Sequence, residues 1–307
     1  MIERDEKVID LVEEHIIRAL VYYDIFNYPL TSEEVFRFLG TNRTDAQTVT
    51  RKLLHLAEEG RIYHFSEFFS IQNEESLVPR RIKGNAEAKR LLTLAQKQAA
   101  LIARFPFVRA VMGSGSLSKN YMDDDSDLDF FIVTEPGRLW IARMLLVMYK
   151  RIFLANSHKY FCINYFVDTQ HLEIEEKNLF TATELATVIP LYGAEYYKQL
   201  CDSNQWLLGI FPNYTPRPIT QVPPSHIGRG KKFIEGFINL MFARQINTFF
   251  MNMFSKRVKR IYQRDYPAKD FQVAFKTKDY ASKNHPRHYQ RKVMDLYEQR
   301  LGEVNMR

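Results

Sequence analysis

Two aspartates in this sequence are spaced in a way that points to chemistry. One apolar residue, Leu128, separates Asp127 from Asp129, and an apolar run continues to Val133. Side chains at positions i and i+2 of a strand lie on one face, so both carboxylates should face the same way while Leu128 turns into the core. Carboxylates this close favour a divalent cation between them. The pair therefore predicts a site for Mg²⁺ or Mn²⁺, of the kind completed by water and substrate phosphate.

A turn of small residues precedes the pair. The apolar run that starts at Val108 ends in Gly113-Ser114-Gly115-Ser116. Small residues let backbone N–H groups and hydroxyls approach an anion closely. An anion-binding turn beside a metal-binding carboxylate pair has the outline of a phosphoryl- or nucleotidyl-transfer site.

This stretch resembles the motif of the nucleotidyltransferase superfamily, which includes DNA polymerase beta, the kanamycin nucleotidyltransferases and the small bacterial nucleotidyltransferases. Met112-Gly113-Ser114 matches its first half and Asp127-Leu128-Asp129-Phe130 its second, over a region of roughly residues 85–167. The resemblance implies that Gly113 and Ser114 hold the β- and γ-phosphates of a nucleoside triphosphate. It also implies that Asp127 and Asp129 bind the metal that polarises the α-phosphate. The expected nucleotide-binding residues are Gly113, Ser114, Gly115, Ser116, Ser126 and Asn164.

The family's third carboxylate, often the base that activates the acceptor hydroxyl, has no direct counterpart. Asn164 stands at its place on a strand expected over Lys159–Val167, and an amide accepts no proton at neutral pH. Asp168, on the same strand face, is the residue we add to the catalytic set, with Glu173 as the alternative. Without either, the protein binds one metal, reacts without a side-chain base, or only binds nucleotide.

Other motifs fit these residues less well. A calcium loop from Asp123 needs Gly at its sixth position and Glu at its twelfth, where the chain has Leu128 and Thr134. A dinucleotide fingerprint would need a third glycine at Ser118, and the Walker lysine pattern is missing. A sugar-nucleotide transferase with an Asp-x-Asp motif, or an acidic surface loop without function, stays open.

Three parts of the chain are expected to position these residues. Residues 1–75 read as three helices and an aromatic hairpin, which resembles a winged helix-turn-helix domain, with a capping box at Thr31 and Glu34. Residues 83–210 form an α/β (α+β) nucleotidyltransferase core with a mixed β-sheet. Within it, Thr181–Leu200 is expected to be a helix broken at Pro190. Residues 225–307 form a mostly helical, basic region. Linkers are expected at 76–82 and, with five prolines, at 212–224.

Composition limits the class of protein. The 307 residues are 46% hydrophobic, which is enough for two or three domains. Only two cysteines occur and the first residues are highly charged, so we expect a cytoplasmic protein without disulfides or a signal peptide. Charged or polar residues interrupt the apolar segments Leu139–Ala155 and Gly236–Phe254, so no membrane partner is expected. The run Phe233–Phe254 is interpreted as core of the C-terminal region.

The formal charge of +7 comes from the C-terminal part, where residues 256–307 hold 14 Lys or Arg against 6 Asp or Glu. That excess fits phosphates of a nucleotide, an RNA or a DNA, or else a solvated basic face. His285 and His288 have no partner ligands at metal spacing. In the third helix, Arg51 and Lys52 are balanced by acidic residues, which favours packing or protein contact over DNA binding.

The sequence thus predicts a Mg²⁺-dependent nucleotidyltransferase that moves a nucleoside monophosphate from a nucleoside triphosphate to an acceptor. The acceptor is a small molecule, a protein side chain or a nucleic-acid end. The alternative is a regulatory protein whose degenerate transferase core senses nucleotide while the winged helix contacts DNA or a protein. The sequence does not indicate an oligomeric state.

Overall fold

The computed structural model describes residues 2–155, 159–284 and 289–305, so His285 and His288 lie outside the described residues. The N-terminal part contains three helices and then a two-stranded hairpin, in the expected order. The capping box is confirmed, because Thr31 and Glu34 each bind the other's backbone N–H. The elements are α1 (Ile2–Asp24), α2 (Ser32–Arg37), α3 (Ala46–Glu58), β1 (Tyr63–Phe65) and β2 (Phe68–Ser70).

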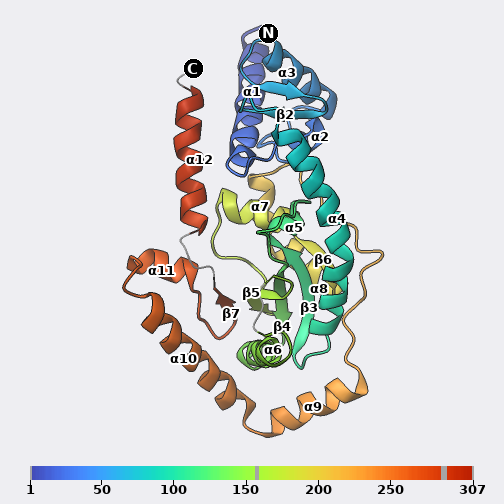
Figure 1. Cartoon of the computed structure of the whole chain (residues 1–307), viewed down its shortest axis with the longest axis vertical. Helices are drawn as coiled ribbons and strands as arrows, with labels where there is room; N and C mark the ends of the chain where they lie inside the picture. Colours follow the sequence, from blue (N-terminus) through green and yellow to red (C-terminus); the bar gives the residue numbers. More distant parts are fainter. Residues whose placement is uncertain (1, 156–158, 285–288, 306–307) are drawn as a thin grey trace.

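The linker expected at 76–82 is wrong, because these residues belong to the long helix α4 (Leu77–Ile102). Pro79 lies in its first turn, where backbone N–H groups have no partner within the helix, so its missing N–H costs little. In Figure 1, α4 runs from the N-terminal part down along the central sheet. The helix therefore joins the N-terminal part to the central sheet.

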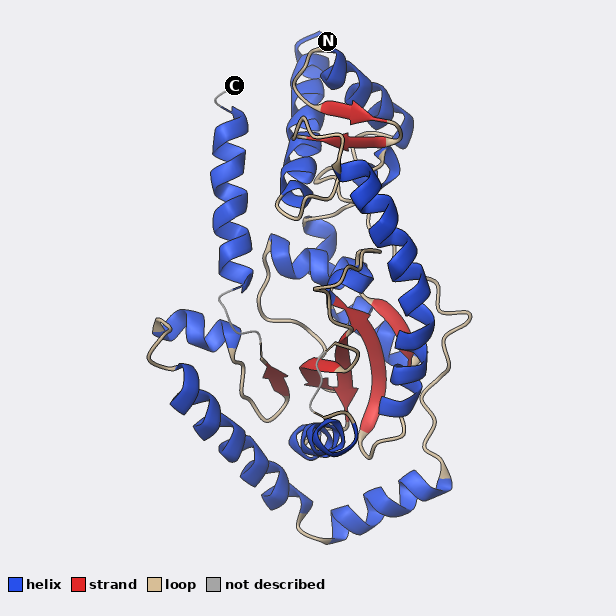
Figure 2. Cartoon of the chain, in the orientation of Figure 1, coloured by secondary structure: helices blue, strands red, loops and turns tan. Residues whose placement is uncertain are grey.

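A mixed five-stranded sheet forms the centre, in the order β6-β3-β4-β5-β7 (Figure 2). The pair β4–β5 is parallel, and the other neighbours are antiparallel. The helix expected over Thr181–Leu200 is instead α7 (Leu179–Thr187), β6 and α8 (Ala194–Ser203). Pro190 lies in β6, an edge strand where a missing ladder N–H is tolerated. The strands are β3 (Val108–Ser114), β4 (Asp129–Thr134), β5 (Cys162–Asp168), β6 (Ile189–Tyr192) and β7 (Ala281–Lys283).

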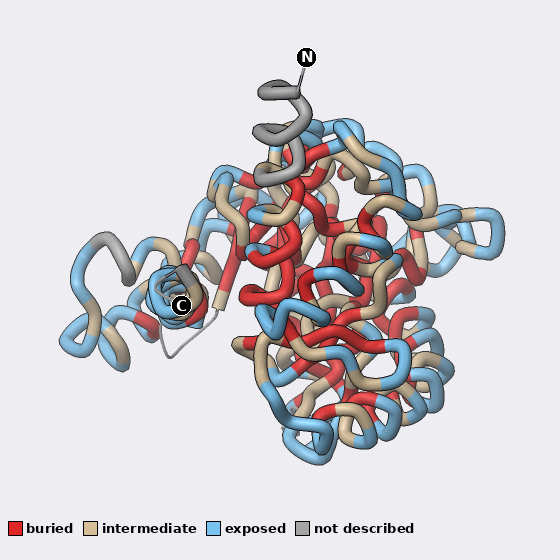
Figure 3. The backbone as a smooth tube through the Cα atoms, turned by 90° about the horizontal axis from the view of Figure 1, so that it is seen from above, coloured by how far each residue is buried: buried red, intermediate tan, exposed pale blue. Residues whose placement is uncertain are grey.

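Strand alternation divides the core into two layers. Phe130 and Ile132 of β4 pack with α4 and with α6 (Leu139–Phe153), and Phe131 and Val133 pack on the opposite face with α8. Figure 3 shows the buried segments gathered in the middle of the molecule. Asp129 is two residues before Phe131 on the same strand, so its side chain lies on the face of the sheet that α8 covers. Leu128 is fully buried with the α4 and α6 layer, as predicted.

The C-terminal region is mostly helical, as expected, and it also adds β7 to the sheet. Its last helix lies beside α1 (Figure 1), where Tyr297 packs edge to face on Tyr22 and Arg300 pairs with Asp24. These contacts join the two ends of the described chain in one apolar cluster. The elements after α8 are η1 (Gln205–Gly209), α9 (Arg229–Leu240), α10 (Ala243–Tyr262), α11 (Ala268–Ala274) and α12 (Tyr289–Asn305).

The interpretation of Phe233–Phe254 as core is wrong for its outer half. Phe233, Phe237 and Phe249 are exposed, whereas Phe250 and Phe254 pack against the sheet layer. The run is two helices that cross the surface, and each buries only one side. Within the described parts of the chain, no helix has both the length and the apolar character needed to span a membrane.

Candidate functional site

Asp129 of the predicted carboxylate pair lies against the glycine–serine turn, whereas Asp127 precedes β4 and does not line the cavity beside it. Ser114, the last residue of β3, is the register partner of Asp129, the first residue of β4. Gly115 then opens the four-residue helix α5 (Gly115–Ser118) with a φ of 63°, and a Cβ placed there would overlap the Asp129 carboxylate. Asp127 is close enough for its charge to act on Asp129. The strand therefore delivers one carboxylate directly against the bend.

The surroundings of Asp129 disfavour its charge. Burial, followed by the charges of Asp127 and Glu184, raises the pKa of Asp129 to about 6, and Lys119 opposes them. A divalent cation would compensate both carboxylates, which is the physical reason for expecting one here.

Metal affinity should depend on pH through this group. The folded pKa lies above the ordinary value of 3.8, so below about pH 6 the carboxyl is protonated and competes with metal binding. We expect the apparent dissociation constant for Mn²⁺ to weaken about tenfold from pH 7 to pH 5. In the metal-free protein, the stability that this group contributes is present below about pH 4 and is lost as pH rises to about 6. Titration calorimetry at several pH values measures the first effect, and a flat profile would contradict it.

Gly115 and Gly137 provide a matched pair of substitutions. Both have a positive φ, of 63° and 67°, but only Gly115 has neighbours within 4 Å of an added Cβ. Gly115→Ala should push the Asp129 carboxylate aside and lower Mg²⁺-dependent nucleotide turnover about 100-fold. Gly137→Ala should cost only about 1–2 kcal/mol of backbone strain and leave turnover unchanged. Equal turnover in the two variants would show that the contact with Asp129 has no role.

A cavity of about 250 Å³ opens beside Asp129. One wall is polar, with Ser114, Gly115, Ser116, Asp129 and Asn164. The other walls are mostly aromatic. Their residues come from the N-terminal part, the central sheet region and the C-terminal region. Their aromatic residues are Tyr23, Phe26 and Tyr28, Tyr121, Phe131, Tyr165 and Phe180, and Tyr289 of α12.

Three charged residues of this cavity were not predicted. Glu184 of α7 pairs with Lys119, the residue after α5, at 2.7 Å, and both line the cavity. Lys283 of β7 is buried, and its ammonium donates to Gln290 at 3.0 Å. Among the described residues no carboxylate pairs with it. Their positions in the sequence gave no signal, because the sheet and α7 bring them to Asp129 only in the folded chain.

The side chain of Tyr23 lines both this cavity and a neighbouring cavity that Glu34 and Arg37 also line. Its ring is buried and lines the cavity, and its oxygen makes no hydrogen bond in the described structure. A buried hydroxyl without a partner loses about 1–3 kcal/mol unless a ligand or water satisfies it.

The structure does not bring Asp168 to the pair. Thr134, at the far end of β4, is its register partner, whereas Asp129 pairs with Cys162 six residues earlier on β5. At about 3.3 Å per residue this places Asp168 roughly 20 Å away. Its carboxylate instead accepts hydrogen bonds from the turn residues Gln170 and His171. Glu173 is exposed and pairs with Lys177, so neither residue supplies a third carboxylate.

Asn164 does occupy the place expected for it. Its Nδ2 donates to Asp129 Oδ1 at 2.6 Å, and it lines the cavity. Ser126 differs, because its hydroxyl closes the acidic loop by binding Asp123 and does not line the cavity. Gly113 lies inside the sheet, between its register partners in β4 and β6, so only the later part of the turn faces the cavity.

The carboxylate pair fits Mg²⁺ by its chemistry, because two carboxylates with space for water and phosphate oxygens are sufficient for that ion. The described residues contain no group of three or more His, Cys, Asp or Glu side chains arranged to hold a metal.

Much of the basic C-terminal charge is placed elsewhere. Lys276 and Lys278 pair with Glu175, and Lys276 also pairs with Glu176. Of the Lys and Arg described in that region, Lys283 is the one that lines the cavity.

No family model, curated protein or solved structure matches this chain.

Proposed function

We propose that this protein is a Mg²⁺-dependent nucleotidyltransferase that transfers a nucleoside monophosphate from a nucleoside triphosphate to an acceptor. The observation that carries the proposal is the direct approach of the Gly115 bend to Asp129 at the wall of an open cavity, with Asp127 close enough for its charge to act on Asp129. Such a bend can bind phosphate oxygens while the carboxylates bind the cation that accompanies them.

Each residue has a distinct part. Ser114 and Ser116 offer hydroxyls, and the bend between them offers backbone N–H groups, to the terminal phosphates of the triphosphate. Asp127 and Asp129 would hold Mg²⁺, which supplies charge neutralisation at the reacting phosphate. Asn164 orients Asp129 through its hydrogen bond. Glu184 is the cavity-lining carboxylate placed to accept a proton from the acceptor hydroxyl, with Lys119 holding it in position.

The cavity favours a small acceptor over a macromolecule. A volume of about 250 Å³ with walls from α1, α5, α7 and α12 suits a compact molecule with a flat or apolar body. A nucleic-acid end would need a groove with accessible cations. Here Lys119 is paired with Glu184, and Lys283 is buried. Small hydroxylated molecules are therefore the first acceptors to test.

The test separates binding from transfer. Thermal shift is measured with each nucleoside triphosphate, with and without Mg²⁺, and pyrophosphate release is then measured with pooled small hydroxylated molecules. Metal-dependent stabilisation by a nucleotide, followed by acceptor-dependent pyrophosphate release, supports the transferase. Absence of any metal-dependent nucleotide shift would reject the site itself.

A second function is favoured by one observation, the amide at position 164. Asn164 cannot take a proton, and Asp168 is too distant to replace a third carboxylate. A nucleotide-sensing protein would show the Mg²⁺-dependent thermal shift but no pyrophosphate release with any acceptor. DNA binding by the N-terminal part would appear as a thermal shift with duplex DNA that persists without nucleotide.

A further inference from the structure

A large apolar surface is exposed on α9 and α10. Of the nineteen exposed large apolar side chains among the described residues, nine lie between residues 233 and 261. Monomeric proteins seldom leave so many together in water without a partner. The nine are Phe233, Ile234, Phe237, Leu240, Met241, Phe242, Phe249, Met253 and Ile261.

The outer side of α9 carries this surface as a continuous stripe. Phe233, Phe237 and Leu240, which we call the outer stripe, follow each other at i, i+4 and i+7 and therefore share one helix face. The inward side is held by Glu235, whose carboxylate binds Arg109 at 2.9 Å and the backbone N–H of Phe107 at 2.6 Å. The outer stripe therefore points away from the body.

The corner between the two helices continues the stripe. Phe242 has a φ of 54°, a left-handed conformation that is unfavourable for a bulky residue, and yet its side chain is 76% exposed. Leu240 is 83% exposed next to it. The left-handed residue turns the chain between α9 and α10 as the N-cap of α10, and it leaves the Phe242 ring exposed at this corner.

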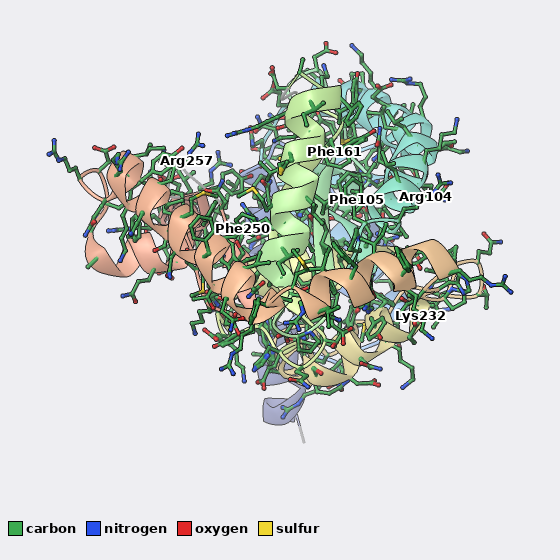
Figure 4. All side chains as sticks on the ribbon, turned by 90° about the horizontal axis from the view of Figure 1, so that it is seen from below. Arg104, Phe105, Phe161, Lys232, Phe250 and Arg257 are labelled. Carbon is green, nitrogen blue, oxygen red and sulfur yellow. The ribbon has the colours of Figure 1, made fainter. Side chains whose placement is uncertain are left out.

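The exposed charged side chains of α9 and α10 are all cationic. Residues 229–262 contain eight Lys or Arg and one acidic residue, and that residue, Glu235, is buried against Arg109. The exposed surface of α9 and α10 therefore presents cations without exposed carboxylates. Figure 4, seen from below, shows the two helices crossing this face, with Lys232 on α9 and Arg257 on α10.

The exposed apolar side chains and the cations distinguish between two possible partners for this face, a second copy of the chain and a lipid bilayer. A second copy of this chain in a symmetric contact would bring two sets of cations together, which opposes association. An anionic bilayer offers opposite charge to the cations and an apolar interior to the aromatic side chains. Amphipathic helices that lie in a membrane interface have this combination of a basic flank with Phe and Leu on the apolar side.

We infer that α9 and α10 dock this protein on the surface of an anionic lipid bilayer, with the outer stripe and the Phe242 corner inserted at the interface. The segment lies in the membrane plane and does not span it. In Figure 1 this face is at the lower end of the molecule, whereas α1, α7 and α12 are above the sheet. Docking leaves the walls of the cavity uncovered, so the inference does not depend on the proposed transferase activity.

Co-sedimentation of the full chain with lipid vesicles tests this inference. The protein should bind phosphatidylcholine vesicles that contain phosphatidylserine, bind pure phosphatidylcholine weakly, and lose affinity as salt rises. Phe233→Ser/Leu240→Ser should lower the partition coefficient about 100-fold, close to tenfold for each side chain withdrawn from the interface. Lys256→Gln/Lys259→Gln should lower binding to the anionic vesicles more than tenfold.

The matched control removes apolar surface elsewhere. Leu54→Ser/Leu208→Ser changes two exposed leucines on α3 and η1 and should bind vesicles as the unchanged protein does. All variants should keep the circular dichroism spectrum, because the altered side chains are exposed. Unchanged vesicle binding by Phe233→Ser/Leu240→Ser, or no binding of anionic vesicles by the unchanged protein, would overturn the inference. So would a lipid-free dimer that this variant abolishes, which would assign the face to a second copy.

Discussion

Asp129→Asn should abolish Mg²⁺-dependent nucleotide turnover, with a loss of about 1,000-fold or more. Removing one of two carboxylates takes away several kcal/mol of charge stabilisation at the reacting phosphate, and each 1.36 kcal/mol is a factor of ten in rate. The amide keeps the shape of the side chain and can still pair with Asn164. Metal-dependent stabilisation by nucleotide, measured by thermal shift, should disappear together with turnover.

The same variant should be more stable than the original protein when no metal is present. Folding raises the pKa of Asp129 to about 6, so the ionised group opposes folding at neutral pH. Replacing it with a neutral amide should therefore raise the unfolding free energy by about 1–3 kcal/mol at pH 7. Asp125→Asn is the matched control, because it removes an exposed carboxylate of the same acidic loop. Equal turnover in the two variants would contradict a role for the pair.

Glu235→Ala should lower the unfolding free energy by about 3–5 kcal/mol. Glu235 and Arg109 form a buried bidentate pair at 2.9 and 3.0 Å, and removing Glu235 leaves the buried Arg109 with only the half-exposed Glu135 as a counter-charge. The backbone N–H of Phe107 also loses its acceptor. Urea unfolding followed by circular dichroism measures this loss. A slope different from that of the original protein would show that α9 detaches before the rest unfolds.

Two comparisons make the Glu235 result specific. Replacing both charges, as in Arg109→Met/Glu235→Met, should cost less than Glu235→Ala, because no buried charge is left unpaired. Asp202→Asn breaks an exposed pair with Lys198 and should cost less than about 1 kcal/mol. A loss in Glu235→Ala no larger than in Asp202→Asn would mean that α9 is not held by this ion pair.

The parts of the fold that could be predicted depend on local signals. Thr31 and Glu34 identify a helix start by their own spacing, and the apolar runs after Val108 and Leu128 identify strands by burial. Errors arose where tertiary context decided. Pro79 signalled a linker but is accommodated in the first turn of α4, and Pro190 signalled a helix break but lies on an edge strand. A proline restricts the backbone at its own position, but it does not show whether a helix, a strand or a loop contains it.

In the candidate site, too, the predictable residues have local signals in the sequence, and the others are placed by the tertiary fold. Asp129 and the Gly115 bend could be predicted because they lie at the facing ends of β4 and β3, two adjacent strands with a short connection. Glu184 and Lys283 could not, since α7 and β7 reach the cavity only through the sheet order. The placement of Asp168 was wrong for a related reason, because residues on one strand face are near a site only at the same end of the strand.

The cavity has a consequence for how the protein is made. Its walls include Tyr23 near the start of this sequence and Lys283 and Tyr289 near its end. A nascent chain that has emerged from the ribosome only as far as α8 contains both carboxylates and the bend. It still lacks Lys283 and Tyr289, which form part of the cavity wall. Under the proposed function, a substrate can be enclosed only after β7 and α12 have been synthesised and docked.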